Sequence, residues 1–157
     1  MDRVTIIDAS LMINGSGKTV WEVLSDLALV ERYDPTVQSA KVVSPESEGV
    51  GATREVVFAN GDRLRESVTR FEPRRHLDFQ SYATSMAVKS MTRSYSMDDE
   101  GKRTRVTVEF EYQMKYGLVG KALEQIWFRK RLGTIVHAGL YSIKRYVEVG
   151  SQNPKRT

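Results

Sequence analysis

The feature that most constrains this chain is a series of short β-rich runs followed by one long amphipathic segment. Runs of this kind cover residues 3–13 and then about 37–44, 52–59, 63–72, 76–83, 91–98 and 103–115. Turn-forming residues separate them: Asn60-Gly61-Asp62 carries the Asn-Gly signal of a hairpin, and Pro73 ends the run before it. The pattern predicts an antiparallel sheet of seven strands.

The run at 103–115 shows how this sheet divides its two faces. Apolar side chains occupy every second position, at Val106, Val108, Phe110, Tyr112 and Met114. The positions between them are polar, at Thr107, Glu109, Glu111 and Gln113. An antiparallel sheet with this alternation has one dry face and one wet face.

Helical segments are predicted on either side of the strand series. Two short helices, at 18–24 and 28–33, follow the first run, and Asp34-Pro35 ends the second because a residue before proline disfavours helix. A long helix is predicted from Leu118 to Val147, with apolar residues at 119, 122, 123, 126, 136, 140, 143 and 147. It is the only element large enough to cover the dry face of the sheet. The fold class is therefore α+β, a seven-stranded curved sheet around the C-terminal helix.

The stretch NGSGKT at 14–19 looks like a phosphate-binding loop. The full motif G-x-x-x-x-G-K-[ST] needs a glycine five positions before Gly17, and that position is Met12. No alternation of strands and helices follows, as such a loop would require. We therefore expect Asn14 to Gly17 to form a turn in which a small polar residue caps the next helix.

Length and composition exclude several classes of function. A chain of 157 residues fits one domain, expected at 1–149, with a frayed tail at 150–157. The chain has no cysteine, a net charge of +4 and a pI near 9.4, and its basic clusters are not interleaved with exposed aromatics. We therefore predict no metal site, no cofactor and no nucleic-acid partner. The N-terminal residues lack a long apolar core, and no apolar run is long enough to span a bilayer, so we expect a cytoplasmic protein without stable membrane insertion.

The order of elements and several short motifs resemble the START-like, Bet v 1-like superfamily, in particular bacterial polyketide cyclase/dehydrase-type proteins. The motifs are Val20-Trp21-Glu22-Val23, Tyr33-Asp34-Pro35, Leu64-Arg65-Glu66, the corner from Phe71 to Leu77, and Tyr116-Gly117-Leu118-Val119-Gly120. The resemblance covers nearly the whole chain and implies a helix-grip fold with a ligand cavity between sheet and helix. It says less about chemistry, since folds of this kind host carriers, receptors and enzymes.

The predicted sheet supplies five candidate ligand-binding residues. Glu66 and Arg93 are expected to point inward, where an ion pair would offset the cost of burying each charge. This pair could be structural, or it could orient a ligand carbonyl or hydroxyl. Tyr95, Phe110 and Tyr112 would form an aromatic wall with polar tips.

The long helix supplies three further candidates. Gly133 lies on its apolar face, where a glycine could make room for a ligand or for close packing. His137, one turn later, is either a satisfied core residue or an acid/base group at the pocket floor. Trp127 could border the entrance or clamp the helix onto a strand. A second apolar stripe (Phe128, Leu132 and Ile135) is expected to meet the wrapping sheet, with a homodimer interface or an anionic membrane surface as alternatives.

Three functions are consistent with this set of residues. The first is binding of a small hydrophobic molecule such as a lipid, an isoprenoid quinone or a polyketide. The second is a polyketide aromatase/cyclase or dehydrase with His137 or Glu66 as the acid/base group. The third is an interaction protein with a vestigial pocket.

Overall fold

A computed structural model describes residues 4–115 and 122–152, with side chains described for 4–115 and 126–150. The strands are β1 (Val4–Ile13), β2 (Val37–Val42), β3 (Thr53–Phe58), β4 (Arg63–Glu72), β5 (His76–Thr84), β6 (Val88–Asp99) and β7 (Thr104–Met114). The helices are α1 (Gly17–Ser25), α2 (Val30–Tyr33) and α3 (Ala122–Gln152). The predicted order of seven strands and three helices is confirmed.

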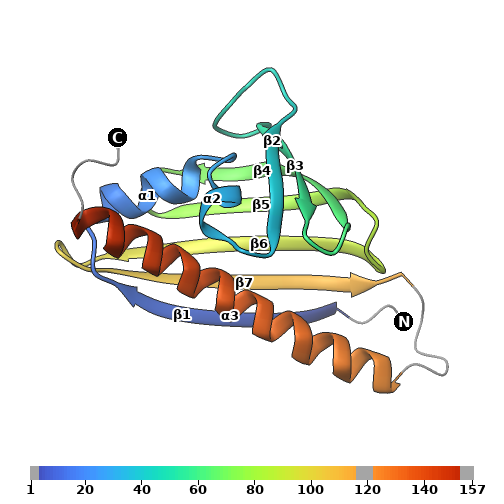
Figure 1. The fold of residues 1–157 in the computed structure, drawn as a ribbon. Coiled ribbons are helices and arrows are strands. Elements are labelled where there is room, and N and C mark those ends of the chain that lie inside the picture. Colours follow the sequence, from blue (N-terminus) through green and yellow to red (C-terminus); the bar gives the residue numbers. More distant parts are fainter. Residues whose placement is uncertain (1–3, 116–121, 153–157) are drawn as a thin grey trace.

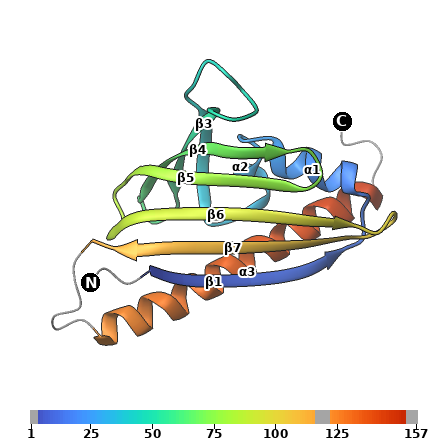
Figure 2. The ribbon, with the colours of Figure 1, turned by 180° about the vertical axis from the view of Figure 1, so that it is seen from behind.

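All seven strands form one antiparallel sheet in the order β1-β7-β6-β5-β4-β3-β2. The sheet is strongly curved, so that β2 and β3 run steeply across the direction of β5, β6 and β7 (Figure 1). Helix α3 crosses one face of this sheet obliquely, and seen from behind the strands lie in front of it (Figure 2). The predicted helix-grip fold is confirmed.

The face of β7 that the alternation marked as dry is buried. Val106, Val108, Phe110 and Tyr112 are each at most 6% exposed, and Met114 packs against the same core. Between the sheet and α3 they meet residues of the helix that include Val136, Leu140, Ile143 and Val147. The burial of these side chains supplies the main driving force for gripping the helix.

The segment NGSGKT connects β1 to α1 and contacts the end of α3. Ser16 is the N-cap of α1, and its hydroxyl accepts a hydrogen bond from the Thr19 amide at 3.3 Å. A Cβ placed on Gly17 would lie 2.2 Å from an Asp99 carboxylate oxygen, so a protein carboxylate already lies at this helix start. A Cβ on Gly15 would lie 2.7 Å from Cγ1 of Val147, so this glycine allows α3 to approach closely. The prediction of a capped turn is confirmed.

The C-terminal end of the chain differs from the expectation of a tail from Gly150 onward. Helix α3 continues to Gln152, and residues 153–157 lie outside the described residues. The predicted start of the helix at Leu118, and the motif Tyr116 to Gly120, also lie outside them.

Candidate functional site

A cavity with two adjoining chambers lies between the curved sheet and α3. The inner chamber has a volume of about 80 Å³ and the outer chamber about 590 Å³. Five residues line both chambers: Thr36, Phe58, Phe110, Leu132 and Ile135. The volume of the outer chamber is within the usual range for small-molecule sites, about 300 to 1,000 Å³.

The inner chamber ends on a buried cluster of charges. The Arg54 guanidinium donates to one carboxylate oxygen of Glu66 through Nε at 2.8 Å and Nη2 at 2.7 Å. Nη2 of Arg93 donates to the other oxygen of Glu66 at 3.4 Å. Arg54 also donates from Nη1 to the Leu27 carbonyl at 3.1 Å. Glu66 is therefore held by two arginines, and it is only 1% exposed.

Aromatic rings fix the two guanidinium groups in place. Arg54 lies over the Phe79 ring at 4.5 Å from its centroid, and Arg93 lies over the Phe110 ring at 5.3 Å. Such cation–π contacts gain strength where water is excluded. Nε of Arg93 is buried and has no hydrogen-bond partner among the described residues. A donor of this kind is costly to leave unpaired, and Arg93 lines the inner chamber.

The cluster shifts the pKa values of its members. Burial opposes ionisation of Glu66, but the nearby charges of Arg93 and Arg54, with the hydrogen bonds from Arg54, hold its pKa below the usual value. Burial by itself would lower the pKa of Arg93, yet Glu66 and Tyr95 keep that pKa above its usual value. Tyr33 lies close enough to feel the charges of Arg54 and Arg93, but burial outweighs them and raises the pKa of this phenol far above its ordinary value. Tyr33 therefore stays protonated. The result is a carboxylate and two permanent cations at the closed end of the cavity.

A second carboxylate lines the inner chamber. Asp34, directly after α2, accepts hydrogen bonds at one oxygen from the Thr36 amide at 2.9 Å and the Thr36 hydroxyl at 2.6 Å. Its formal charge and that of Glu66 cancel the formal charges of Arg54 and Arg93. The closed end of the cavity is therefore polar but carries no net formal charge.

Three of the predicted sheet residues line the cavity, and two do not. Arg93, Tyr95 and Phe110 line the inner chamber. Glu66 lies behind it, where it binds Arg54 and Arg93, so the predicted ion pair with Arg93 is confirmed. Tyr112 is buried and packs on the Phe128 ring, with ring centroids 5.3 Å apart.

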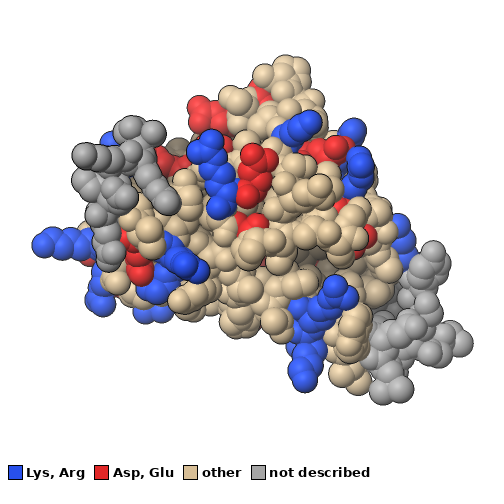
Figure 3. Space-filling view, in the orientation of Figure 1, with Lys and Arg blue, Asp and Glu red and all other residues tan. Residues whose placement is uncertain are grey.

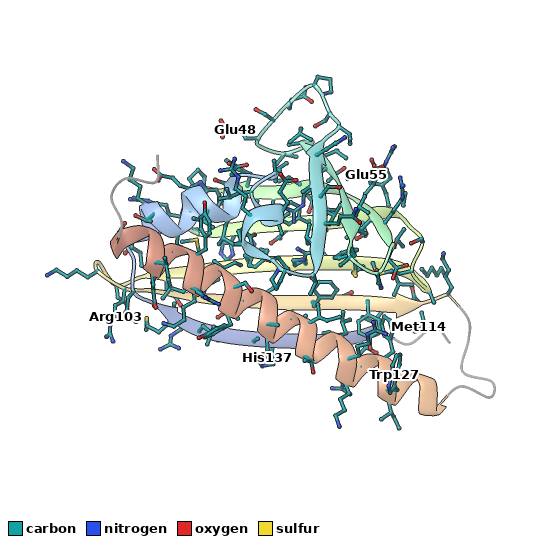
Figure 4. The ribbon with its side chains drawn as sticks, viewed as in Figure 1. Glu48, Glu55, Arg103, Met114, Trp127 and His137 are labelled. Carbon is teal, nitrogen blue, oxygen red and sulfur yellow. The ribbon has the colours of Figure 1, made fainter. Side chains whose placement is uncertain are left out.

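The three helix candidates lie away from both chambers. His137 is exposed, and its Nδ1 lies 2.8 Å from the Gly133 carbonyl of its own helix. Trp127, in the first described turns of α3 (Figure 4), is 61% exposed, and its ring contacts the Arg131 guanidinium. Gly133 lines a separate groove against β1, and a Cβ there would have no heavy atom within 4 Å. Both predicted positions of His137, in the core or at the pocket floor, are therefore wrong.

The three helix candidates lie away from the cavity because α3 is rotated about its axis relative to the orientation that the sequence predicted. The stripe formed by Phe128, Leu132 and Ile135 faces the cavity, with Leu132 and Ile135 lining both chambers. Ile126, which the predicted apolar face included, is 66% exposed. The expectation that this stripe meets the wrapping sheet is confirmed for Phe128 and Leu132, which pack against the core, whereas Ile135 is 38% exposed. The homodimer alternative stays a prediction.

Two residues of the site, Arg54 and Asp34, were missed in the sequence. Arg54 lies directly opposite Glu66 in the β3–β4 hairpin. The turn at Asn60-Gly61-Asp62 fixes that register, so opposite charges facing each other across the hairpin were a usable signal. Asp34 was interpreted only as the residue that ends a helix before Pro35.

Metal chemistry has no recognisable site in the part of the chain that the structure describes. No group of three or more His, Asp or Glu side chains there could hold a metal ion. Within the same residues, none of the helices combines the length and the apolar character that a membrane-spanning segment requires.

The sequence also matches a known protein family. Residues 5–148 match the family model described as "Polyketide cyclase / dehydrase and lipid transport". The chain belongs to this family. The match spans the sheet and nearly all of α3, and it agrees with the resemblance to START-like proteins. No curated protein sequence matches the chain significantly.

Solved structures show the same fold at low sequence identity. The Zhui aromatase/cyclase from Streptomyces sp. R1128 has a TM-score of 0.85 and 12% identity, covering 99% of this chain and 100% of its own. A START superfamily protein from Mycobacterium smegmatis has a TM-score of 0.75 and 10% identity, covering 91% and 97%. The ginseng major latex-like protein 151 from Panax ginseng has a TM-score of 0.71 and 14% identity, covering 91% and 97%. At these identities the likeness concerns the fold.

Proposed function

We propose that this protein binds one elongated hydrophobic molecule, such as a lipid, an isoprenoid quinone or a polyketide, in the cavity between sheet and α3. The observation that carries the proposal is an apolar cavity that ends at Arg93, a largely buried cation whose buried Nε has no hydrogen-bond partner among the described residues. The apolar part of the ligand occupies the outer chamber. Its polar end accepts a hydrogen bond from Arg93, with Tyr95 as the neighbouring polar group.

The charge balance at the closed end favours a neutral polar group on the ligand. The formal charges of Arg54 and Arg93 are already matched by those of Glu66 and Asp34. A carbonyl or hydroxyl oxygen satisfies the free Nε–H of Arg93 without adding an uncompensated charge to a buried site. Among the candidate ligands, ketones and quinones fit this requirement best.

The junction between the chambers offers a direct test. Leu132 lines both chambers, so we expect Leu132→Trp to fill the passage and weaken binding of Nile red, a neutral apolar dye with a carbonyl, at least about tenfold. Thr134→Trp is the matched control, because Thr134 is exposed on the same helix. Dye fluorescence gives the affinities, and thermal unfolding checks that both variants fold. Equal affinity in the two variants would exclude this cavity as the site.

A cyclase or dehydrase reaction is a second candidate, favoured by the family description and by the Asp34 carboxylate in the inner chamber. In this reaction Asp34 removes a proton next to a ligand carbonyl, and Arg93 and Tyr95 hold the enolate oxygen. The earlier acid/base candidates fit poorly. His137 is exposed, and Glu66 has a lowered pKa and accepts bonds at both oxygens.

One assay with a poly-β-ketone chain distinguishes the binding function from the cyclase or dehydrase function. If the protein is a cyclase, Asp34→Asn abolishes cyclisation while Nile red binding persists, and His137→Ala changes neither. Cyclisation by Asp34→Asn at the rate of the unmodified protein removes Asp34 as the base. Binding without any turnover leaves the carrier function.

A further inference from the structure

The outer side of α3 is strongly basic. From Ile126 to Val147 the sequence contains no Asp or Glu, and the first turns of this range carry Arg129, Lys130 and Arg131. Lys144, farther along, pairs with Glu148 and does not belong to this outer side. On the face shown in Figure 3, where α3 crosses the front, basic side chains stand out at the lower right over the first half of the helix. No acidic side chain lies among them on this face, and Asp8 of β1 is the acidic residue that shares a groove with Arg129 and Lys130. A positive patch of this kind attracts an anionic partner.

Large apolar side chains are exposed within this basic patch. Ile126 is 66% exposed and Trp127 is 61% exposed. The guanidinium of Arg131 lies 5.2 Å from the centre of the Trp127 ring, so the aromatic and basic groups form one surface. The expectation that no basic cluster lies beside an exposed aromatic is therefore wrong here. Tryptophan beside Lys and Arg is typical of helices that lie in the interface of a membrane.

The patch reaches the cavity at Arg131. Arg131 lines the outer chamber with Phe128, Leu132 and Ile135, whereas Ile126, Arg129 and Lys130 line the separate groove against β1. A partner that contacts Arg131 and Trp127 therefore lies next to the outer chamber. An apolar ligand could then move between this partner and the chamber with little exposure to water.

We propose that the first turns of the described part of α3 dock the cavity mouth onto an anionic membrane surface. Arg129, Lys130 and Arg131 face lipid phosphates, and Ile126 and Trp127 enter the headgroup layer. Nucleic acid or an acidic protein would satisfy the charges, but neither accounts as well for an exposed isoleucine and an exposed tryptophan beside these charges. The use of docking to exchange ligand rests on the proposed function, whereas the docking itself does not.

The test is co-sedimentation with vesicles, without added ligand. We expect binding to vesicles of equal parts phosphatidylcholine and phosphatidylglycerol, and little binding to pure phosphatidylcholine. The double variant Arg129→Glu/Lys130→Glu should bind the anionic vesicles at least about 30-fold more weakly, from the usual effect of one basic residue at such a surface taken twice. The matched control is Lys102→Glu/Arg103→Glu, with the same charge change at the opposite end of the molecule (Figure 4).

Fluorescence of Trp127 checks which face docks. In a Trp21→Phe background, Trp127 is the only tryptophan, and its emission should shift to shorter wavelength when anionic vesicles are added. The proposal is overturned if the protein does not sediment with anionic vesicles, or binds neutral ones equally well. It is also overturned if the two double variants bind alike, or if the protein sediments without any Trp127 shift. Nile red binding in solution is unaffected by these outcomes, so the two proposals fail separately.

Discussion

Replacing Glu66 by glutamine should destabilise the fold strongly, because it leaves the buried Arg54 and the largely buried Arg93 without their shared counter-charge. Glu66 is 1% exposed and accepts hydrogen bonds from Arg54 and Arg93. Removing one partner of a buried ion pair costs about 3 to 5 kcal/mol. Glutamine keeps one oxygen that can accept from Arg54, so we expect a loss of about 3 kcal/mol. For a domain of this size that corresponds to a decrease in Tm of about 6 to 12 °C.

A matched control lies one strand away. Glu55 on β3 also pairs with a cross-strand arginine, Arg65, at 2.8 Å, but that pair is partly exposed. Glu55→Gln makes the same chemical change on a solvated pair, so we expect little change in stability. Urea unfolding followed by circular dichroism compares the two variants. Equal losses would refute the argument that burial makes the Glu66 cluster costly to break.

The stability difference between the unmodified protein and Glu66→Gln should depend on pH, and the pKa of Glu66 gives the direction of that dependence. The pKa of Glu66 is lower in the folded state than in the unfolded state, so its ionisation stabilises the fold. This contribution is complete above the unfolded value of about 4.3 and is lost as pH falls through the lower folded pKa. Because protonated Glu66 resembles glutamine, the stability gap between the two proteins should close at acidic pH. If this stability difference stays constant or widens on acidification, Glu66 is not the ionised, stabilising group that we infer.

Three further substitutions test packing and capping by thermal unfolding. Gly15→Ala should destabilise the fold, because its Cβ would lie 2.7 Å from Cγ1 of Val147. Gly133→Ala should stabilise the fold by about 1 kcal/mol, because its Cβ would meet no heavy atom within 4 Å. If Gly133→Ala unfolds at a lower temperature than Gly15→Ala, α3 packs differently from this structure. Ser16→Ala should cost about 1 kcal/mol by removing the cap on the Thr19 amide, and no loss would mean that another group caps α1.

The strands could be predicted from sequence because each carries its own local signal. The alternation along β7 and the Asn-Gly turn before β4 depend on neighbours in the chain, and both were interpreted correctly. The ion pair of Glu66 with Arg93 followed from the cost of an inward carboxylate. These inferences need only local pattern and elementary electrostatics.

The orientation of α3 could not be predicted in the same way. Its sequence carries two apolar stripes in the segment from Ile126 to Ile135, and either could face the sheet. Only the rotation of the helix about its axis decides that Leu132 lines the cavity while Ile126 is exposed. The position of His137 depended on that choice, so it was wrong for the same reason.

The polar anchorage of α3 near its C-terminal end has a consequence for ligand exchange. Lys144 donates to the Met12 carbonyl at 2.9 Å, and Glu148 accepts from the Asn14 amide at 2.9 Å, beside the tight approach of Gly15 to Val147. The chambers lie against the part of the helix from Phe128 to Leu140, before these tethers. A movement of α3 that widens the passage would therefore leave residues 144–148 anchored, and amide hydrogens around Leu132 should exchange with solvent faster than those around Val147.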